Sequence, residues 1–136
     1  MSIIQFVVML ALMAAVLTGG VMGISKALAH EHLDGWTRTM TFDIAAGRQA
    51  AQTERATVTV TLGTSSYLIA VTGGSTLKYG AMPTDIAVTT TCPASICSFD
   101  RRGVPIAPGT ITLTSTSLGL THTVTIQAGT GRVSYQ

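Results

Sequence analysis

The sequence predicts an α+β protein in which one long N-terminal helix, apolar in its first half and amphipathic in its second, packs on a C-terminal antiparallel β-sheet. Residues 1–25 carry no charged side chain, and residues 26–55 continue with apolar residues at helical spacing. After residue 56 the pattern changes to alternation of Thr with Val, Ile or Leu, which is typical of half-buried strands. A helix followed by strands is the order of an α+β fold.

The apolar run over residues 1–25 is the first expected element. As a helix of this length it spans about 38 Å, more than a bilayer core of about 30 Å. A cleaved secretory signal is an alternative, because residues 27–29 read ALA, the small-x-small form of a cleavage site. No Lys or Arg precedes the run, however, and the run exceeds the roughly 7 to 15 apolar residues of a signal. The sequence therefore favours a functional membrane helix.

The same helix is expected to continue, as an amphipathic helix, to about Glu54. Gly35 and Gly47 weaken this part without ending it. The apolar residues at roughly helical spacing are Leu28, Leu33, Trp36, Met40, Ile44 and Ala51, with Lys26, Asp34, Arg38, Arg48 and Arg55 between them. One face of residues 26–55 should therefore pack on the strands.

Six strands are predicted after the helix, over residues 57–62, 66–72, 86–91, 110–114, 121–127 and 132–135. Gly73 and Gly74 mark one turn, Gly119 joins the fourth and fifth strands, and the GTG of residues 129–131 marks the last turn. Thr on one side and Val, Ile or Leu on the other predict an antiparallel sheet with one solvent face. Residues 26–136 are expected to form one globular domain, with its sheet in residues 56–136.

Composition excludes several classes of function. The chain has 136 residues, a net charge of +2 and only 10% charged residues, while Thr and Ser supply 33 positions. A basic nucleic-acid-binding module needs a stronger positive excess, and a multi-domain enzyme needs a longer chain. No nucleophile elbow or other catalytic signature is present. We therefore expect no enzyme and no cofactor.

The histidines offer only a weak metal hypothesis. His30 and Asp34 lie one helical turn apart, a spacing at which two ligands can hold zinc. A solvated stretch of helix just past the apolar run is the favoured interpretation, so no metal site is predicted. His122 stands alone in a predicted strand and is expected on its solvent face.

Residues 1–8, MSIIQFVV, resemble the start of a mature type IV pilin whose leader has been removed. That family begins with Phe or Met and has a hydrophobic helix that continues into an amphipathic one before a sheet, so the resemblance covers the whole chain. Residues 99–105, FDRRGVP, precede PGTITL at 108–113, and GTGRV follows at 129–133. This combination is similar to the H-type pseudopilins of type II secretion and to T-type fimbrial minor pilins.

The resemblance implies a structural subunit of a type IV pilus-like filament, held in the inner membrane before assembly and displayed on the extracellular pilus afterwards. It implies partners: further copies in a helical filament, other pilins, the prepilin peptidase and the assembly machinery. It implies N-terminal processing and methylation at Met1, and assembly contacts from Gln5, Phe6, Val7, Leu10 and Met13. A minor pseudopilin of a type II secretion system and a DNA-binding competence pilin are the alternatives.

Two departures from the family's pattern occur in the helix. Pilins usually have Glu at position five, which pairs with the N-terminal amine of a neighbouring subunit, whereas this chain has Gln5. An amide can accept a hydrogen bond from an ammonium group but brings no opposite charge, and a buried ammonium is costly without one. The family often has Pro near positions 21 to 23; here Gly19, Gly20 and Gly23 are expected to provide the helix break in the assembled state.

The cysteines, Cys92 and Cys97, enclose the segment CPASIC. A metal site would need more ligands, and a redox Cys-x-x-Cys motif has shorter spacing. In the oxidising space beyond an inner membrane, which the resemblance implies, the two are expected to form a disulfide.

Three arginines, Arg101, Arg102 and Arg132, are candidates for contact with DNA phosphates if the fold gathers them. DNA-binding T-type relatives carry a further basic residue just after Gly-Arg near the C-terminus. Here Val133 and Ser134 follow Arg132, so that motif is incomplete. Scattered surface charges are the favoured interpretation, and DNA contact stays open.

Overall fold

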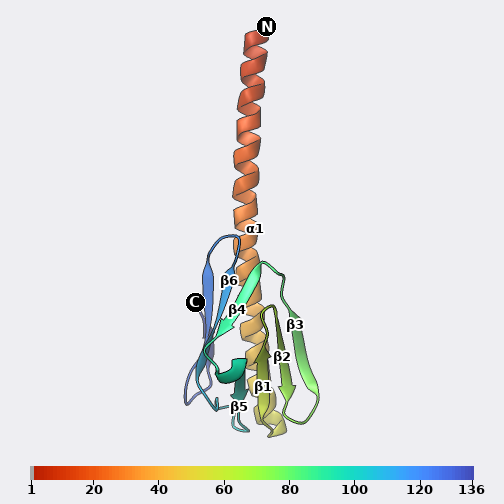
Figure 1. Cartoon of the computed structure of the whole chain (residues 1–136), viewed down its shortest axis with the longest axis vertical. Coiled ribbons are helices and arrows are strands. Elements are labelled where there is room, and N and C mark those ends of the chain that lie inside the picture. Colours follow the sequence, from red (N-terminus) through yellow and green to blue (C-terminus); the bar gives the residue numbers. More distant parts are fainter. Residues whose placement is uncertain (1) are drawn as a thin grey trace.

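The computed structural model describes residues 2–136, which form one long helix and eight strands (Figure 1). Helix α1 spans Ile3–Glu54, so at about 1.5 Å per residue it is about 78 Å long. The Ser2 hydroxyl caps its start, and Arg55, with a φ of 51°, ends it in the left-handed region. The predicted helix, from near Ser2 to about Glu54, is confirmed.

The first half of α1 projects from the globular part, and the second half lies against the strands (Figure 1). The fully buried apolar residues of α1 are Leu33, Met40, Ile44 and Ala51, and their spacing keeps them on one face. Two residues of the predicted apolar set differ from the prediction. Leu28 is 61% exposed, because α1 only begins to meet the strands there, and Trp36 is partly buried at the edge of the core.

The strands form two four-stranded antiparallel sheets, where the sequence pattern predicted an undivided one. The first sheet has the order β3-β2-β1-β5, formed by Thr76–Ala81, Ser66–Val71, Val58–Leu62 and Ile96–Phe99. The second sheet has the order β4-β6-β7-β8, formed by Ile86–Thr90, Gly109–Ser115, Thr121–Ile126 and Val133–Tyr135. Strands of both sheets contact α1, so the two sheets together enclose more of the helix than one flat sheet would.

The six predicted strands are confirmed to within one residue at each end, but β3 and β5 were not predicted. Strand β3 is an edge strand in which only Gly80 is buried, so no apolar alternation marks it. Strand β5 has only four residues and follows directly on the short 3-10 helix Pro93–Ser95. The sequence pattern therefore does not predict either strand, and each is identified only by its pairing in the structure, β3 with β2 and β5 with β1.

The predicted division of strand faces is confirmed by the pairing of β6 with β7. Ile111 lies opposite Val124, and both are fully buried against the core. Thr112 lies opposite Thr123, one residue along each strand, and both are partly exposed. The apolar residues therefore face α1 and the threonines face solvent.

The predicted disulfide between Cys92 and Cys97 is confirmed, and it closes the crossing between the two sheets. Cys92 follows β4 of the second sheet, and Cys97 lies within β5 of the first. Both residues are at least 95% buried. Gly109, the first residue of β6, approaches the Cys92 sulfur so closely that a side chain at that position would overlap it. The glycine thus lets the second sheet lie directly against the disulfide.

Candidate functional site

The first half of α1 leaves its large apolar side chains exposed. Those more than half exposed are Ile3, Ile4, Phe6, Val7, Val8, Met9, Leu10, Leu12, Met13, Val16, Leu17, Val21, Met22, Ile24 and Leu28. An 18-residue window of α1 has a mean hydropathy of 2.3 and is nowhere buried, so this helix is long and apolar enough to cross a membrane. Soluble monomers rarely expose an apolar surface of this size, which usually marks an interaction site.

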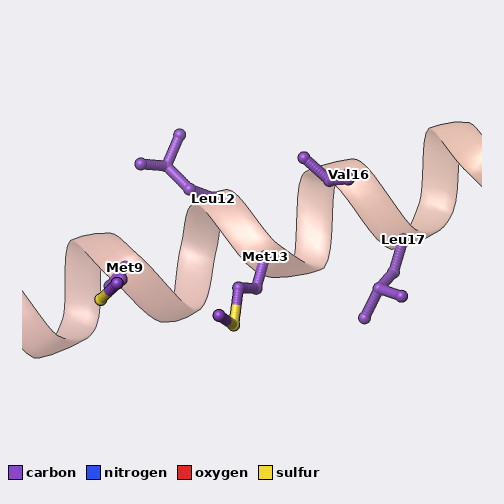
Figure 2. A pocket seen from close by; sticks show the side chains of 5 residues that line it. All are labelled: Met9, Leu12, Met13, Val16 and Leu17. Carbon is purple, nitrogen blue, oxygen red and sulfur yellow. The ribbon is translucent and has the colours of Figure 1, made fainter.

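Five of these side chains border a shallow apolar groove along the helix (Figure 2). They are Met9, Leu12, Met13, Val16 and Leu17. In Figure 2, Leu12 and Val16 point to one side of the helix and Met13 and Leu17 to the other. Residues spaced by three and four positions form the ridges that pack into grooves of a second helix. The groove therefore suits another apolar helix or lipid chains.

The predicted assembly residues Phe6, Val7, Leu10 and Met13 all belong to this exposed apolar surface. Of these four, only Met13 borders the groove. Their exposure agrees with an assembly contact, while the contact itself stays a prediction.

Gln5, at the position where pilins usually have Glu, caps its own helix. The Ser2 hydroxyl accepts a hydrogen bond from the Gln5 backbone N–H at 3.3 Å, and the Ser2 N–H donates to Gln5 Oε1 at 3.5 Å. This reciprocal pair is a capping box, in which Gln and Glu serve alike. Gln5 therefore has a role within its own subunit that needs no charge. Met1, the predicted site of processing and methylation, lies outside the described residues.

Helix α1 is continuous through Gly19, Gly20 and Gly23. All three glycines have open space around them, so no packing contact requires a glycine there. The hydroxyls of Thr18 and Ser25, on either side, donate to carbonyls one turn earlier, at 3.0 Å and 2.9 Å. Such back-bonding slightly weakens and often bends helices. The predicted break concerns the assembled filament, and it stays a prediction.

Arg48 of α1 joins two loops of the globular part. Its Nε donates to the Gly103 carbonyl at 2.9 Å, and its Nη2 donates to the Thr130 carbonyl at 2.7 Å. Gly131 approaches the Gly103 carbonyl so closely that no side chain fits there. The two C-terminal motifs on which the resemblance to pseudopilins rests therefore meet on α1. The sequence alone showed Arg48 only as a charged position of an amphipathic helix.

The candidate DNA-contacting residues Arg101, Arg102 and Arg132 are exposed on these two loops. Asp100 orders the first loop, because its Oδ1 accepts hydrogen bonds from the backbone N–H groups of Arg102 at 2.8 Å and Val104 at 3.0 Å. The structure thus brings together the loops that carry the arginines. Contact with DNA stays a prediction.

Residues 37–130 match a family described as type II transport protein GspH. The chain belongs to the GspH family. The matched region covers α1 from Thr37 onward and strands β1 to β7, so it includes Arg48 and Gly103. No curated protein sequence matches the chain.

Two crystal structures of the type IV minor pilin FimU from Pseudomonas aeruginosa (strain PAO1) are similar to this GspH-family chain. The P21 form has a TM-score of 0.65 at 12% identity, over 79% of this chain and 90% of FimU. The P65 form has a TM-score of 0.59 at 14% identity, over 73% of this chain and 88% of FimU. At this identity the likeness shows the fold alone, and that fold is the predicted one: a long helix packed on antiparallel sheets.

A buried polar pair, Asp43 and Tyr67, was not predicted. Asp43 lies on the buried face of α1, 8% exposed, and accepts a 2.5 Å hydrogen bond from the hydroxyl of Tyr67 on β2. Burial, and then the Asp43 carboxylate, raise the pKa of Tyr67 well above its ordinary value. The Tyr67 ring covers Gly80, its partner on β3, where any side chain would overlap it. The sequence signal that could have predicted this pair is Asp43 itself, because a carboxylate on the apolar face of a helix needs a buried polar partner.

The polar residues near the start of the globular part bond within the protein. His32 Nε2 accepts a hydrogen bond from the Trp36 indole at 3.1 Å, and its Nδ1 lies 3.5 Å from the Asp85 carboxylate. Asp34 pairs with Arg38 at 3.0 Å. Within residues 2–136, no group of three His, Cys, Asp or Glu side chains is placed to hold a metal ion.

The placement of His122 on the solvent face was wrong. Its ring packs edge-to-face on His30 of α1, with centroids 6.3 Å apart, and its Nδ1 is buried. Residues two apart on a strand share a face, so His122 points inward with Val124. The alternation of inward and outward residues along residues 121–127 therefore already predicts that His122 points inward.

Proposed function

We propose that this chain is a structural subunit of a type IV pilus-like filament, without enzymatic activity. Residues 1–25 hold it in the inner membrane before assembly, and the same helix packs against helices of other subunits in the extracellular filament. The supporting observation is the contrast within α1. One face of the second half is buried by the chain's own strands, whereas every large apolar side chain of the first half that the structure describes is exposed.

The exposed half of α1 is stable in either of two environments, a bilayer or a bundle of helices. Removing apolar surface from water contributes about 25 cal/mol per Å², so covering about 80–100 Å² of one side chain is worth about 2 kcal/mol. Lipid chains are as apolar as Leu, so transfer from bilayer to filament changes this burial little. Machinery that extracts the subunit is therefore an expected partner, together with the prepilin peptidase. In the filament, each subunit contacts the next through two different surfaces. Because such head-to-tail contacts do not close into a ring, they repeat into a helical filament.

A charge within the apolar groove tests this proposal. Met13→Lys places an ammonium group in the middle of the exposed surface, at a cost of about 2.5–3.5 kcal/mol in a membrane and a similar obstacle in a helix bundle. We expect the variant to vanish from sheared surface filaments. The control is Tyr79→Lys, which places the same charge on β3, at a side chain that is 62% exposed. This variant should assemble normally. Normal filament recovery for Met13→Lys would contradict the proposal, and membrane fractionation shows at which step the variant fails.

A minor pseudopilin of a type II secretion system is the second candidate role, and the family match favours it. The absence of a carboxylate at position five also suits a subunit used once or a few times rather than throughout a filament. Purified filaments distinguish the roles, because mass analysis identifies their main subunit. A pseudopilin would be scarce in filaments, and its deletion would stop protein secretion.

A DNA-binding competence pilin is the third candidate role, favoured by the meeting of the two arginine-bearing loops on Arg48. Binding to phosphates releases counterions, so retention on immobilised DNA should fall steeply with salt. Arg132→Ala should weaken retention, whereas Arg38→Ala should not, because Arg38 lies outside the two loops and pairs with Asp34 of α1. Absence of retention at low salt would exclude this role.

A further inference from the structure

Phe42 is a large apolar side chain that the globular part leaves in solvent. It lies in the second half of α1, between the buried residues Met40 and Ile44, and is 73% exposed. Because a helix turns by about 100° per residue, Phe42 points away from the face that packs on the strands. Ala45 and Ala46, one turn further along, are also exposed. The chain's own strands therefore leave Phe42 uncovered.

Phe42 continues the exposed apolar surface of the first half of α1. A helix returns to the same side every five turns, about 18 residues. Phe6, Ile24 and Phe42 are 18 positions apart, so they lie on one line along α1, and all three are more than half exposed. Met13 and Leu17 of the apolar groove lie within about 20° of this line. A single exposed Phe is ordinary on a protein surface, whereas this one extends an existing apolar surface by about 27 Å beyond Ile24.

Lipid does not cover Phe42 while α1 spans a membrane. The uncharged run ends at Ser25, and Lys26 is the first charged residue. Phe42 lies 17 residues beyond this end, which is about 26 Å along the continuous helix. The headgroup region outside the bilayer core is only about 5–8 Å thick on each side. Phe42 therefore stands in water before assembly, and a partner that covers it has to be another protein chain.

We propose that Phe42 seats in the apolar groove of a second copy of this chain. The inference rests on the proposed filament and names one contact within it. The groove lies on a half of α1 that has no charged side chain, so it offers Phe42 an apolar environment (Figure 2). For two parallel helices, Phe42 meets Met13, at the centre of the groove, when the copies are offset by 29 residues, about 44 Å. The two contacting surfaces differ, so the contact repeats along a filament.

The same offset keeps the two globular parts apart along the filament axis. It places residues 2–25 of the second copy beside residues 31–54 of the first copy, where the helix of the first copy ends. The second copy's own strands meet its helix from about His30 onward, where His122 contacts it. At this offset, that level lies beyond Glu54 of the first copy. The projecting half of one copy therefore fits beside the globular half of the next (Figure 1).

Glu31 supports this offset. Its side chain is exposed and lies within about 20° of the line through Phe42. It forms no ion pair within residues 2–136. At an offset of 29 residues, Glu31 of the first copy is level with Ser2, which caps the helix of the second copy. The first turn of α1 has no acidic residue, so a carboxylate from the neighbouring copy would stabilise the positive end of that helix dipole.

Disulfide trapping in sheared filaments tests the contact. Phe42→Cys and Met13→Cys are expressed together, on separate copies of the full-length chain; the native Cys92 and Cys97 are joined to each other and do not take part. We expect crosslinked dimers from this pair. Pairing Phe42→Cys with Tyr79→Cys, at an exposed side chain of β3, should give at least ten-fold fewer. Residues 13 and 42 of one chain are about 44 Å apart along α1, so every link between them joins two copies.

Substitution of Phe42 measures what the contact contributes to assembly. Phe42→Asp places a charge against the groove, whereas Phe42→Leu keeps an apolar side chain. Because Phe42 is exposed in the single chain, both variants should fold and enter the membrane, which circular dichroism and membrane fractionation check. We expect filament recovery to fall at least ten-fold for Phe42→Asp and to stay near that of the unmodified chain for Phe42→Leu.

Two kinds of failure are distinguishable. Filaments that contain the chain but no crosslink between Phe42→Cys and Met13→Cys would overturn this inference alone, as would normal recovery of Phe42→Asp. Absence of the unmodified chain from all filaments would overturn the proposed function on which the inference rests. Phe42→Cys linked to a different pilin, and not to Met13→Cys, would overturn the choice of a second copy as the occupant of the contact.

Discussion

Arg48 Nε donates a 2.9 Å hydrogen bond to the carbonyl oxygen of Gly103, 55 residues further along the chain. The same guanidinium group reaches the Thr130 carbonyl through Nη2. The rigid fork of Arg bonds two carbonyls at once, whereas Lys offers a single ammonium group. One helical residue therefore positions both loops that carry the exposed arginines.

Replacement of Arg48 should destabilise the globular part. A hydrogen bond to a charged group contributes about 1.5–3 kcal/mol, so we expect Arg48→Lys to lower the free energy of unfolding by about 1–2 kcal/mol and Arg48→Ala by more. Denaturant titration of the chain in detergent measures this. The control is Arg38→Ala, which removes an exposed ion pair with Asp34 and should cost no more than about 0.5 kcal/mol. Equal losses for Arg38→Ala and Arg48→Ala would mean that the two carbonyl contacts add nothing.

Gly131→Ala should be more harmful than Gly129→Ala. Both glycines have positive φ, 68° and 80°, so alanine is strained at either position. Only at Gly131 would the added methyl group also overlap the Gly103 carbonyl, whereas Gly129 has open space. Thermal unfolding should show the larger decrease for Gly131→Ala. Equal decreases in melting temperature for the two variants would indicate that the loops carrying Gly103 and Gly131 can move apart without loss of stability.

Stability should fall above about pH 10 through Tyr67. Its phenol keeps its proton to higher pH in the folded chain, because burial and then Asp43 raise its pKa, while the unfolded phenol titrates near pKa 10. The folded state then binds more protons than the unfolded state, so the free energy of unfolding is unaffected by this group below about pH 10 and decreases above it. Tyr67→Phe should remove this part of the decrease. Tyr79→Phe, which alters an exposed tyrosine, should leave it unchanged, and identical pH profiles for the two variants would count against the effect.

Gln5→Glu should preserve assembly. Glutamate at the same position of a capping box also caps the helix, so the start of α1 is retained. Charge-assisted hydrogen bonds are roughly twice as strong as neutral ones, so increased filament recovery would place a neighbour's N-terminal amine within reach. Without that amine, an added buried carboxylate costs several kcal/mol. Loss of filaments by a variant that still inserts into the membrane would show that the family's usual pairing is absent.

The assembled filament should break or stretch α1 within residues 18–23. The glycines there contribute no packing in the single chain, and each lowers helix stability by about 1 kcal/mol relative to Ala. A filament structure measures this directly through its backbone hydrogen bonds. A continuous α-helical ladder through Gly19, Gly20 and Gly23 would refute the prediction.

The sequence by itself determined the extent of α1, six of the strands and the faces of those strands. These features depend on residues two, three or four positions apart, so the repeat of apolar side chains reports them directly. The error at His122 came from reading one residue in isolation, since its register with Val124 places it inward. The disulfide between Cys92 and Cys97 was predictable because few residues separate the two cysteines and an oxidising compartment was expected.

Only the tertiary structure decided that the strands divide into two sheets and that the chain includes β3 and β5. It also decided which polar residues meet across the core, as Asp43 meets Tyr67 and Arg48 meets Gly103. Each of these features depends on the pairing of segments distant in the chain, and no local repeat encodes such a pairing. An exposed edge strand such as β3 buries too little to leave an apolar pattern, so its partner alone defines it.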